Sequence, residues 1–185
     1  RGASLLSAAW GASGRDIWAV GQNGTIAHYT GQDWAVLSKP TTEALLAVHG
    51  SSARDIWAVG EHGESIHYDG EQWGSITTGE STALYSVSSC GARNAWAVGH
   101  KGVILHWDGA RWTKSESANE HTLRRVLCRS ETEVWAVGDH GTVLRHDGSA
   151  WKPIESGTSA SLDALIFDGR KLWVGGDHGT ILVRK

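Results

Sequence analysis

A six-residue segment recurs through the chain at nearly constant spacing, and this repeat restricts the possible folds more than any other feature. Its first copy is Asp-Ile-Trp-Ala-Val-Gly at residues 16–21, and its Trp recurs at steps of 39, 39, 39 and 38 residues. The first Trp column is Trp18, Trp57, Trp96, Trp135 and Trp173, and a second column is Trp34, Trp73, Trp112 and Trp151. We assign both columns structural roles, because a large flat ring fills the wedge-shaped space between twisted sheets.

Each copy contains four short apolar segments, which predict four strands. In the first copy they cover residues 6–11, 18–21, 25–29 and 33–38. Segments rich in Val, Ile, Leu, Trp and Tyr and bounded by Gly and Asp are typical of strands. No stretch sustains the apolar period of a helix. The chain is therefore expected to be all-β.

Gly-ended pairs lie between the second and third segments of every copy and predict tight two-residue hairpins, because both central residues of such a turn take positive φ. These pairs are Asn23-Gly24, His62-Gly63, Lys101-Gly102, His140-Gly141 and His178-Gly179. The third and fourth segments are joined by Thr30-Gly31, Asp69-Gly70, Asp108-Gly109 and Asp147-Gly148. Linkers rich in Ser, Thr and Glu then lead from the outer edge of one unit to the inner strand of the next.

Repeated units of four antiparallel strands predict a five-bladed β-propeller. We interpret residues 1–185 as one domain with repeats at 5–43, 44–82, 83–121, 122–160 and 161–185. The fifth copy ends at the segment equivalent to a third strand, so the last blade is expected to be three-stranded. The sequence also contains no Met, which suggests a piece of a longer polypeptide. The ring then closes either with this chain alone or with flanking sequence.

The second repeat shows a family resemblance most clearly. Its strand ending at Gly60, followed by Tyr68-Asp69-Gly70 and Trp73, resembles the short-repeat propellers of secreted and surface bacterial proteins. The Gly and the Tyr–Trp pair are similar to kelch repeats, and the Asp-Gly-x-x-Trp hairpin resembles the Asp-box of sialidase-type propellers. The resemblance covers essentially the whole chain and implies a WD40-like or kelch-like propeller. It implies little about activity, because propellers host many unrelated functions.

Charge and motif content exclude several functions. The chain has 17 Lys and Arg against 20 Asp and Glu, so no nucleic-acid partner is expected. No apolar run approaches the ~20 residues of a membrane span, so no membrane insertion is expected. The sequence has no Gly-rich phosphate loop, nucleophile elbow or zinc motif. We therefore expect no catalytic residues, no cofactor and no enzymatic activity.

The innermost strand contains the positions that differ most between copies, and these are the first candidates for a binding site. One column is Trp10, His49, Ser88, Leu127 and Ile166, and another is Ser7, Leu46, Tyr85, Arg124 and Asp163. Structural columns repeat, whereas a binding site on a repeated scaffold differs between blades. The candidate ligand-binding residues are Trp10, His49, Tyr85, Arg124 and Asp163, with simple packing of the channel mouth as the alternative.

Histidines at the turns are a second set of candidates for ligand binding. They are His62, His100, His140 and His178. Several adjoin an acidic residue, and His and Asp are metal ligands. Because the pairs lie on different blades, no metal site is expected. A separate repeated column on the third strand is His28, His67 and His106. We interpret these residues as structural and hydrogen-bonded to the adjacent hairpin, with a repeated ligand site as the alternative.

Cys90 and Cys128 lie 38 residues apart, at the end of the first strand in the third and fourth copies. We expect two unpaired, half-buried thiols. A disulfide is the alternative, and it requires the two Cα atoms to come within ~7 Å and implies an oxidising compartment.

These observations favour a non-enzymatic binding domain. The leading hypothesis is lectin-like carbohydrate recognition by a secreted or cell-surface protein, because aromatic faces stack on sugars and repeated sites give avidity. The alternative is a protein–protein interaction scaffold, and a degenerate sialidase-like hydrolase ranks below both. The partner is then a glycan or a protein ligand. An open edge on the last blade also allows self-association.

Overall fold

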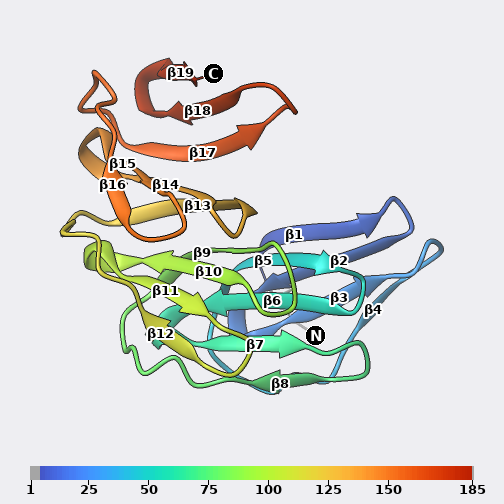
Figure 1. Cartoon of the computed structure of the whole chain (residues 1–185). Coiled ribbons are helices and arrows are strands. Elements are labelled where there is room, and N and C mark those ends of the chain that lie inside the picture. Colours follow the sequence, from blue (N-terminus) through green and yellow to red (C-terminus); the bar gives the residue numbers. More distant parts are fainter. Residues whose placement is uncertain (1–4, 185) are drawn as a thin grey trace.

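Five antiparallel sheets make up the computed structural model, which describes residues 5–184 (Figure 1). Each sheet is one blade, with its strands hydrogen-bonded in chain order. Blade 1 contains β1 (Leu6–Ser13), β2 (Asp16–Gly21), β3 (Ile26–Tyr29) and β4 (Trp34–Val36). Blade 2 contains β5 (Leu45–Ser52), β6 (Asp55–Gly60), β7 (Ser65–Tyr68) and β8 (Trp73–Ser75). Blade 3 contains β9 (Leu84–Ser89), β10 (Ala95–Gly99), β11 (Ile104–Trp107) and β12 (Trp112–Lys114). Blade 4 contains β13 (Leu123–Ser130), β14 (Glu133–Gly138), β15 (Val143–His146) and β16 (Trp151–Pro153). Blade 5 contains β17 (Leu162–Phe167), β18 (Leu172–Gly176) and β19 (Ile181–Arg184).

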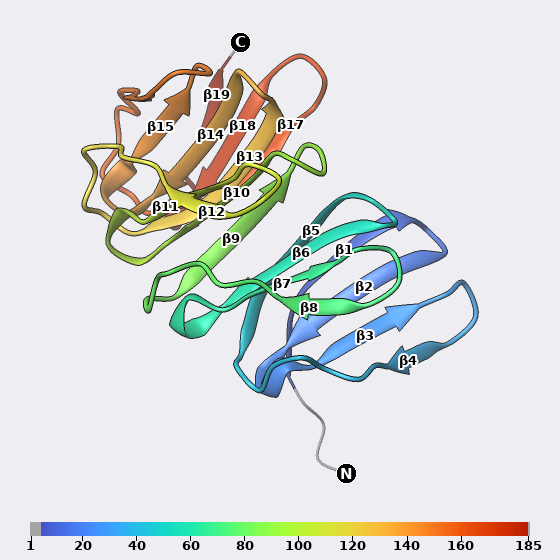
Figure 2. The ribbon, with the colours of Figure 1, turned by 60° about the horizontal axis from the view of Figure 1, so that its bottom comes forward.

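The inner strands β1, β5, β9, β13 and β17 lie side by side in chain order, and blades 1 and 5 form the two ends of the row (Figure 2). The predicted all-β, five-bladed propeller with a three-stranded last blade is confirmed. Within residues 5–184 the helical segments are five three-residue 3-10 turns, one in each blade. The outer strands are shorter than expected, because β4 pairs with β3 only through Trp34–Val36.

In blades 1 to 4, the Trp of the second strand packs against the next blade. Trp57 on β6 is fully buried. Its indole stacks on His67 of its own blade, with ring centroids 4.2 Å apart. On the side of blade 3, the rings of Trp107 and Trp112 lie 4.8 and 5.0 Å away. One Trp side chain buries ~150–250 Å², so the repeat supplies a large apolar anchor at each joint between blades.

A polar cluster orients the His ring on which this Trp stacks. His67 Nε2 lies 2.7 Å from Asp55 Oδ1, and the hydroxyls of Ser51 and Ser89 also donate to the Asp55 carboxylate. Ser89 belongs to blade 3, so the cluster joins two blades. Burial alone raises the pKa of Asp55, but these hydrogen bonds outweigh burial and hold the pKa below its ordinary value. The His on the third strand is therefore part of the interblade packing in this joint.

The turn after each second strand has two residues at positive φ, as the Gly-ended pairs predict. In blade 2 these are His62 (φ 54°) and Gly63 (φ 71°). Together with Glu61, these two residues form a three-residue 3-10 turn in place of the predicted two-residue hairpin. A Cβ on Gly63 would lie 2.1 Å from the carbonyl oxygen of Glu80, in the linker after the blade. Gly is required by both φ and space, and the linker lies directly on the turn.

Cys90 and Cys128 form a disulfide, so the expectation of two unpaired thiols is wrong. Their Cα atoms lie 5.7 Å apart, because Cys90 directly follows β9 and Cys128 lies near the end of β13, the neighbouring inner strand. The backbone N–H of Cys128 also donates to Ser88 Oγ at 3.0 Å. The bridge ties blade 3 to blade 4 across 38 residues of sequence, which restricts the unfolded chain.

The two end blades expose apolar side chains that the inner blades bury. On the face of blade 1 turned away from blade 2, Leu6 is 55% exposed, whereas Leu45, its equivalent in blade 2, is fully buried. On blade 5, Trp173 is 39% exposed and Ile181 is 69% exposed. In the inner blades, the side chains at the equivalent positions pack against a neighbouring blade. The exposed side chains of blades 1 and 5 therefore lie on sheet faces that have no neighbour among the described residues.

We expect Leu45→Ala to lower the free energy of unfolding by ~2–5 kcal/mol, because it leaves a cavity in the joint between blades 1 and 2. Leu6→Ala makes the same change at the same repeat position on an exposed face and should cost about 0.5 kcal/mol or less. Urea unfolding of both variants measures the difference. Equal losses would contradict the exposed state of this face.

A pair of histidines lies between blades 3 and 4. The rings of His106 and His146 both adjoin Trp96, with centroids 4.2 and 4.9 Å from it. Asn94 stands where blade 2 has Asp55, so the His106 ring meets an amide oxygen in place of a carboxylate. Burial lowers the pKa of both rings, and the charge of His146 lowers that of His106 further.

His146→Tyr should reduce the sensitivity of the protein to acid, and it introduces the residue that blades 1 and 2 have at this position. A His whose folded pKa lies below its ordinary 6.5 favours the folded state above pH 6.5, and that contribution falls as pH falls below 6.5. Between about pH 7.5 and about pH 5.5, the urea midpoint should drop less in the variant than in the wild type. An equal drop would show that His146 does not contribute.

Candidate functional site

Each inner strand contains a β-bulge at its second residue. In the pairing of β13 with β14, Leu123 opposes Gly138 and Arg125 opposes Val137, so Arg124 between them has no partner. The same shift occurs in all five blades and leaves unpaired Ser7, Leu46, Tyr85, Arg124 and Asp163. A bulge redirects the side chain of the extra residue. These bulged residues are one of the two divergent columns of the sequence.

The 3-10 turns lie next to the bulges. In blade 4, the backbone N–H of Asp139, the first turn residue, donates to the carbonyl oxygen of Thr122, just before β13, at 2.9 Å. Every other blade has the equivalent bond, from Gln22 to Leu5, Glu61 to Ala44, His100 to Ala83 and Asp177 to Ser161. The bulged residues, the turns and the linkers between blades therefore share one end of the propeller, which we call the top face.

An ion pair occupies the top face of blade 4. Arg124 Nε donates to Asp139 Oδ1 at 2.5 Å, and this hydrogen bond lowers the pKa of Asp139. The same bond raises the pKa of Arg124, and the nearby Asp177 and Tyr85 raise it further. The Arg124 side chain remains 47% exposed. The group is thus fixed in place by its partner and still accessible to a ligand.

Chemical character changes from blade to blade around the bulges. Blades 1 and 2 present a small hydroxyl and an alkyl group, Ser7 and Leu46, whereas blades 3 to 5 present Tyr85, Arg124 and Asp163. Blades 4 and 5 are also joined here, because Arg125 Nε donates to the carbonyl oxygen of Asp163 at 3.2 Å. A row of unlike groups at equivalent positions can hold an extended ligand in one direction and register.

The structure separates Trp10 and His49 from the other candidates on the inner strands. They pair with the second-strand Trp residues, Trp18 and Trp57, and their own rings lie 5.9 Å apart between blades 1 and 2. His49 Nδ1 accepts a hydrogen bond from the backbone N–H of Ser89 at 3.1 Å, and burial lowers the pKa of His49. Both residues lie within the joints between blades and not at the bulges.

The turn histidines lie on the top face, spread over several blades. His62 Nδ1 lies 2.7 Å from Glu43 Oε2, and this hydrogen bond raises the pKa of His62. The ring of His140 lies 4.7 Å from that of His121. The other two, His100 and His178, occupy the turns of blades 3 and 5. In the part of the chain that the structure describes, no three His, Cys, Asp or Glu side chains converge as metal ligands.

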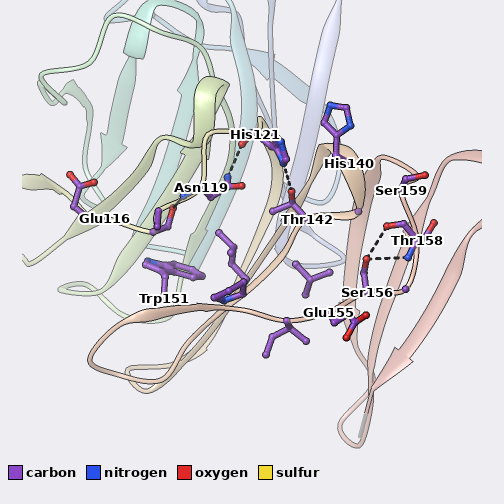
Figure 3. A pocket seen from close by; sticks show the side chains of 18 residues that line it. Glu116, Asn119, His121, His140, Thr142, Trp151, Glu155, Ser156, Thr158 and Ser159 are labelled. Atoms are coloured by element: carbon purple, nitrogen blue, oxygen red, sulfur yellow. Dashed lines mark hydrogen bonds between the residues drawn. The ribbon is translucent and has the colours of Figure 1, made fainter.

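A groove of about 880 Å³ lies over the outer strands of blade 4 (Figure 3). Its floor includes Val143 of β15 and Trp151 of β16, and its walls are the linkers at 116–121 and 154–159. The repeat pattern does not predict this groove, because along the sequence the linkers indicate only connections between repeats. The volume of the groove depends on the distance between two successive linkers above a blade, and the repeated sequence positions do not predict that distance.

The five sheets, their ordered inner strands and their Trp-filled joints define an all-β propeller. No helix within residues 5–184 combines the length and the apolar character needed to cross a bilayer. No protein-family model matches the sequence, and no curated protein matches it.

Solved structures share this fold. "YCF48 bound to D1 peptide" has a TM-score of 0.74 and 20% identity, over 98% of this chain and 65% of that chain. The WD40 β-propeller domain of Doa1 has a TM-score of 0.81 and 12% identity, over 99% and 66% of the two chains. YCF48 from Cyanidioschyzon merolae has a TM-score of 0.70 and 17% identity, over 98% and 67%. This chain thus spans about two thirds of their length, and the likeness establishes the fold. The kelch, Asp-box and bacterial assignments stay predictions.

Proposed function

We propose that the protein is a non-enzymatic interaction domain that binds a segment of a protein partner across the bulged residues of its top face. The observation that carries this proposal is the bulge in every inner strand, which presents a different side chain on each blade of an otherwise repeated scaffold. Tyr85 and Arg124 occupy neighbouring blades, and Tyr and Arg are the residue types that dominate binding energy in protein interfaces.

Two further observations support a peptide ligand and recognition without catalysis. One similar structure is a propeller of the same fold, YCF48, bound to D1 peptide. In this chain Arg124 is paired with Asp139, and the pKa of Asp139 is lowered further from neutrality. A group that transfers protons works best with a pKa near the operating pH, so this pair suits recognition better than proton transfer.

The lectin hypothesis has less support. It depends on aromatic faces that are free to stack on sugars, but the Trp columns of the inner blades lie in the joints. Trp57, Trp96 and Trp135 are each 8% exposed or less. The rings of Trp57 and Trp96 stack on His rings, and the Arg145 guanidinium lies over the ring of Trp135, so these faces are not available to stack on a sugar. Carbohydrate recognition therefore stays a prediction, and so does self-association through the edge of blade 5.

We also propose that the domain works in an oxidising compartment, on a cell surface or outside the cell. The disulfide between Cys90 and Cys128 supports this location, because disulfides persist where thiols are not kept reduced. Mass spectrometry of the protein purified from its source, with free thiols alkylated during denaturation and without a reductant, tests the point. Two alkylated cysteines would contradict it.

Selection from a random peptide library displayed on phage tests the function. Peptides enriched on the wild-type protein should bind Tyr85→Ala and Arg124→Ser ~30-fold more weakly, because loss of an interface hot spot costs about 2 kcal/mol. Ser is the residue that blade 1 has at the position of Arg124. Fluorescence anisotropy of labelled peptides measures the affinity.

Arg111→Ser is the matched control, because Arg111 lies in the hairpin between β11 and β12 and its side chain is 79% exposed. It removes the same charge away from the top face and should leave affinity unchanged. A glycan array probed in parallel separates the two hypotheses. Defined glycan binding without any enriched peptide would favour the lectin and overturn the proposal.

A further inference from the structure

The groove over blade 4 is built differently from the equivalent groove over blade 2. It measures about 880 Å³, against about 390 Å³ for the hollow between β7, β8 and the linker of blade 2. One feature of its wall is unusual. Ala118 takes a φ of 52°, whereas the equivalent positions of the neighbouring linkers are Gly79 and Gly157, both at φ 76°. A residue with a Cβ rarely adopts this conformation, and such positions concentrate at functional sites.

The floor of the groove is apolar. Trp151 is 6% exposed and Val143 2%, while Ile154 is partly buried and Pro153 is exposed. An apolar side chain of a ligand can therefore be buried on this floor, which is the usual source of affinity in a small site.

Each wall of the groove carries one carboxylate. Figure 3 shows Glu116 on one side and Glu155 on the other, and neither side chain forms an ion pair with any residue of 5–184. Arg184 donates to the backbone carbonyl oxygen of Glu155, which leaves the carboxylate itself unpaired. No Lys or Arg lines the groove.

The repeat shows that this charge pattern is specific to blade 4. Glu116 and Glu155 occupy one column, whose earlier members are Ser38 and Thr77. The groove over any blade lies between two successive linkers, and over blade 4 both linkers have Glu at this column. The linkers beside blade 2 also contain carboxylates, Glu43 and Glu80, but these are paired with His62 and Lys114.

Hydrogen bonds within the linkers hold the walls in shape. Ser156 Oγ accepts from the backbone N–H of Thr158 at 3.3 Å and donates to its carbonyl oxygen at 3.1 Å. On the other wall, Asn119 Nδ2 donates to the carbonyl oxygen of His121 at 2.8 Å. A preformed groove binds a flexible peptide at a lower entropic cost than a mobile one.

We propose that the groove over blade 4 is a second binding site, for an extended protein segment with an apolar side chain between two basic side chains. The apolar side chain lies on Trp151 and Val143, and the two Lys or Arg side chains reach Glu116 and Glu155. This site is separate from the bulged residues of the top face, so it is a further site that does not depend on the interaction proposed there.

The test is a phage selection on the double variant Tyr85→Ala/Arg124→Ser, in which the proposed site at the bulged residues is disabled. The probe is again a random peptide library. Enriched peptides should contain Lys or Arg on both sides of an apolar residue, and their affinity should fall with rising salt, because exposed charges are screened. Glu116→Gln/Glu155→Gln in the same background should bind them about tenfold more weakly, since each exposed charge pair contributes modestly.

Glu71→Gln/Glu131→Gln is the control, because it removes the same two charges from exposed residues that do not line the groove. It should leave affinity unchanged. The proposal is overturned if no peptide is enriched, if enriched peptides lack flanking basic residues, or if both double variants bind them equally. Thermal melts confirm that the Gln variants fold. Peptides that are selected on the wild type and do not bind Tyr85→Ala/Arg124→Ser instead identify binding at the bulged residues of the top face. Each of the two proposals can therefore fail without the other.

Discussion

The insertion of the second-strand Trp into the next blade is the interaction on which the structure depends. Trp57 is fully buried between a His of its own blade and two Trp rings of blade 3. A single blade cannot bury its faces alone, and stacking of neighbours produces a continuous core. The Asp–His hydrogen bond at 2.7 Å orients the ring on which this Trp stacks, so packing and polar contacts act together in this joint.

This repeated packing also explains where variation is tolerated. The joints use the Trp columns, the strand interiors and the turn glycines, each of which is tied to a contact with the next blade or linker. The bulged residue of each inner strand is excluded from the strand pairing. Strand pairing therefore does not restrict the residue type at this position. Leu46, Tyr85 and Arg124 occupy it in three successive blades. The same fold thus provides a rigid frame and a variable surface.

The two proposed sites on this frame differ in their chemistry. On the top face, Arg124 Nε lies 2.5 Å from Asp139 Oδ1, so a ligand there contacts an Arg whose charge is already paired. In the groove over blade 4, Glu116 and Glu155 have no ionic partner among the described residues, so a ligand itself must supply the positive charge. One is a mixed polar surface and the other an acidic slot with an apolar floor.

The sequence by itself determined the repeat, the strand order, the three-stranded last blade and the positive φ of the turns, because these depend on local propensity and on a period that is visible along the chain. It also identified Tyr85, Arg124 and Asp163 as a divergent column. Only the tertiary structure showed that this column is the bulge position, and that Trp10 and His49 lie inside joints. The disulfide, the exposed faces of blades 1 and 5 and the groove likewise depend on distances between elements from different repeats. Spacing along the chain does not contain those distances, because they are set by how the blades pack.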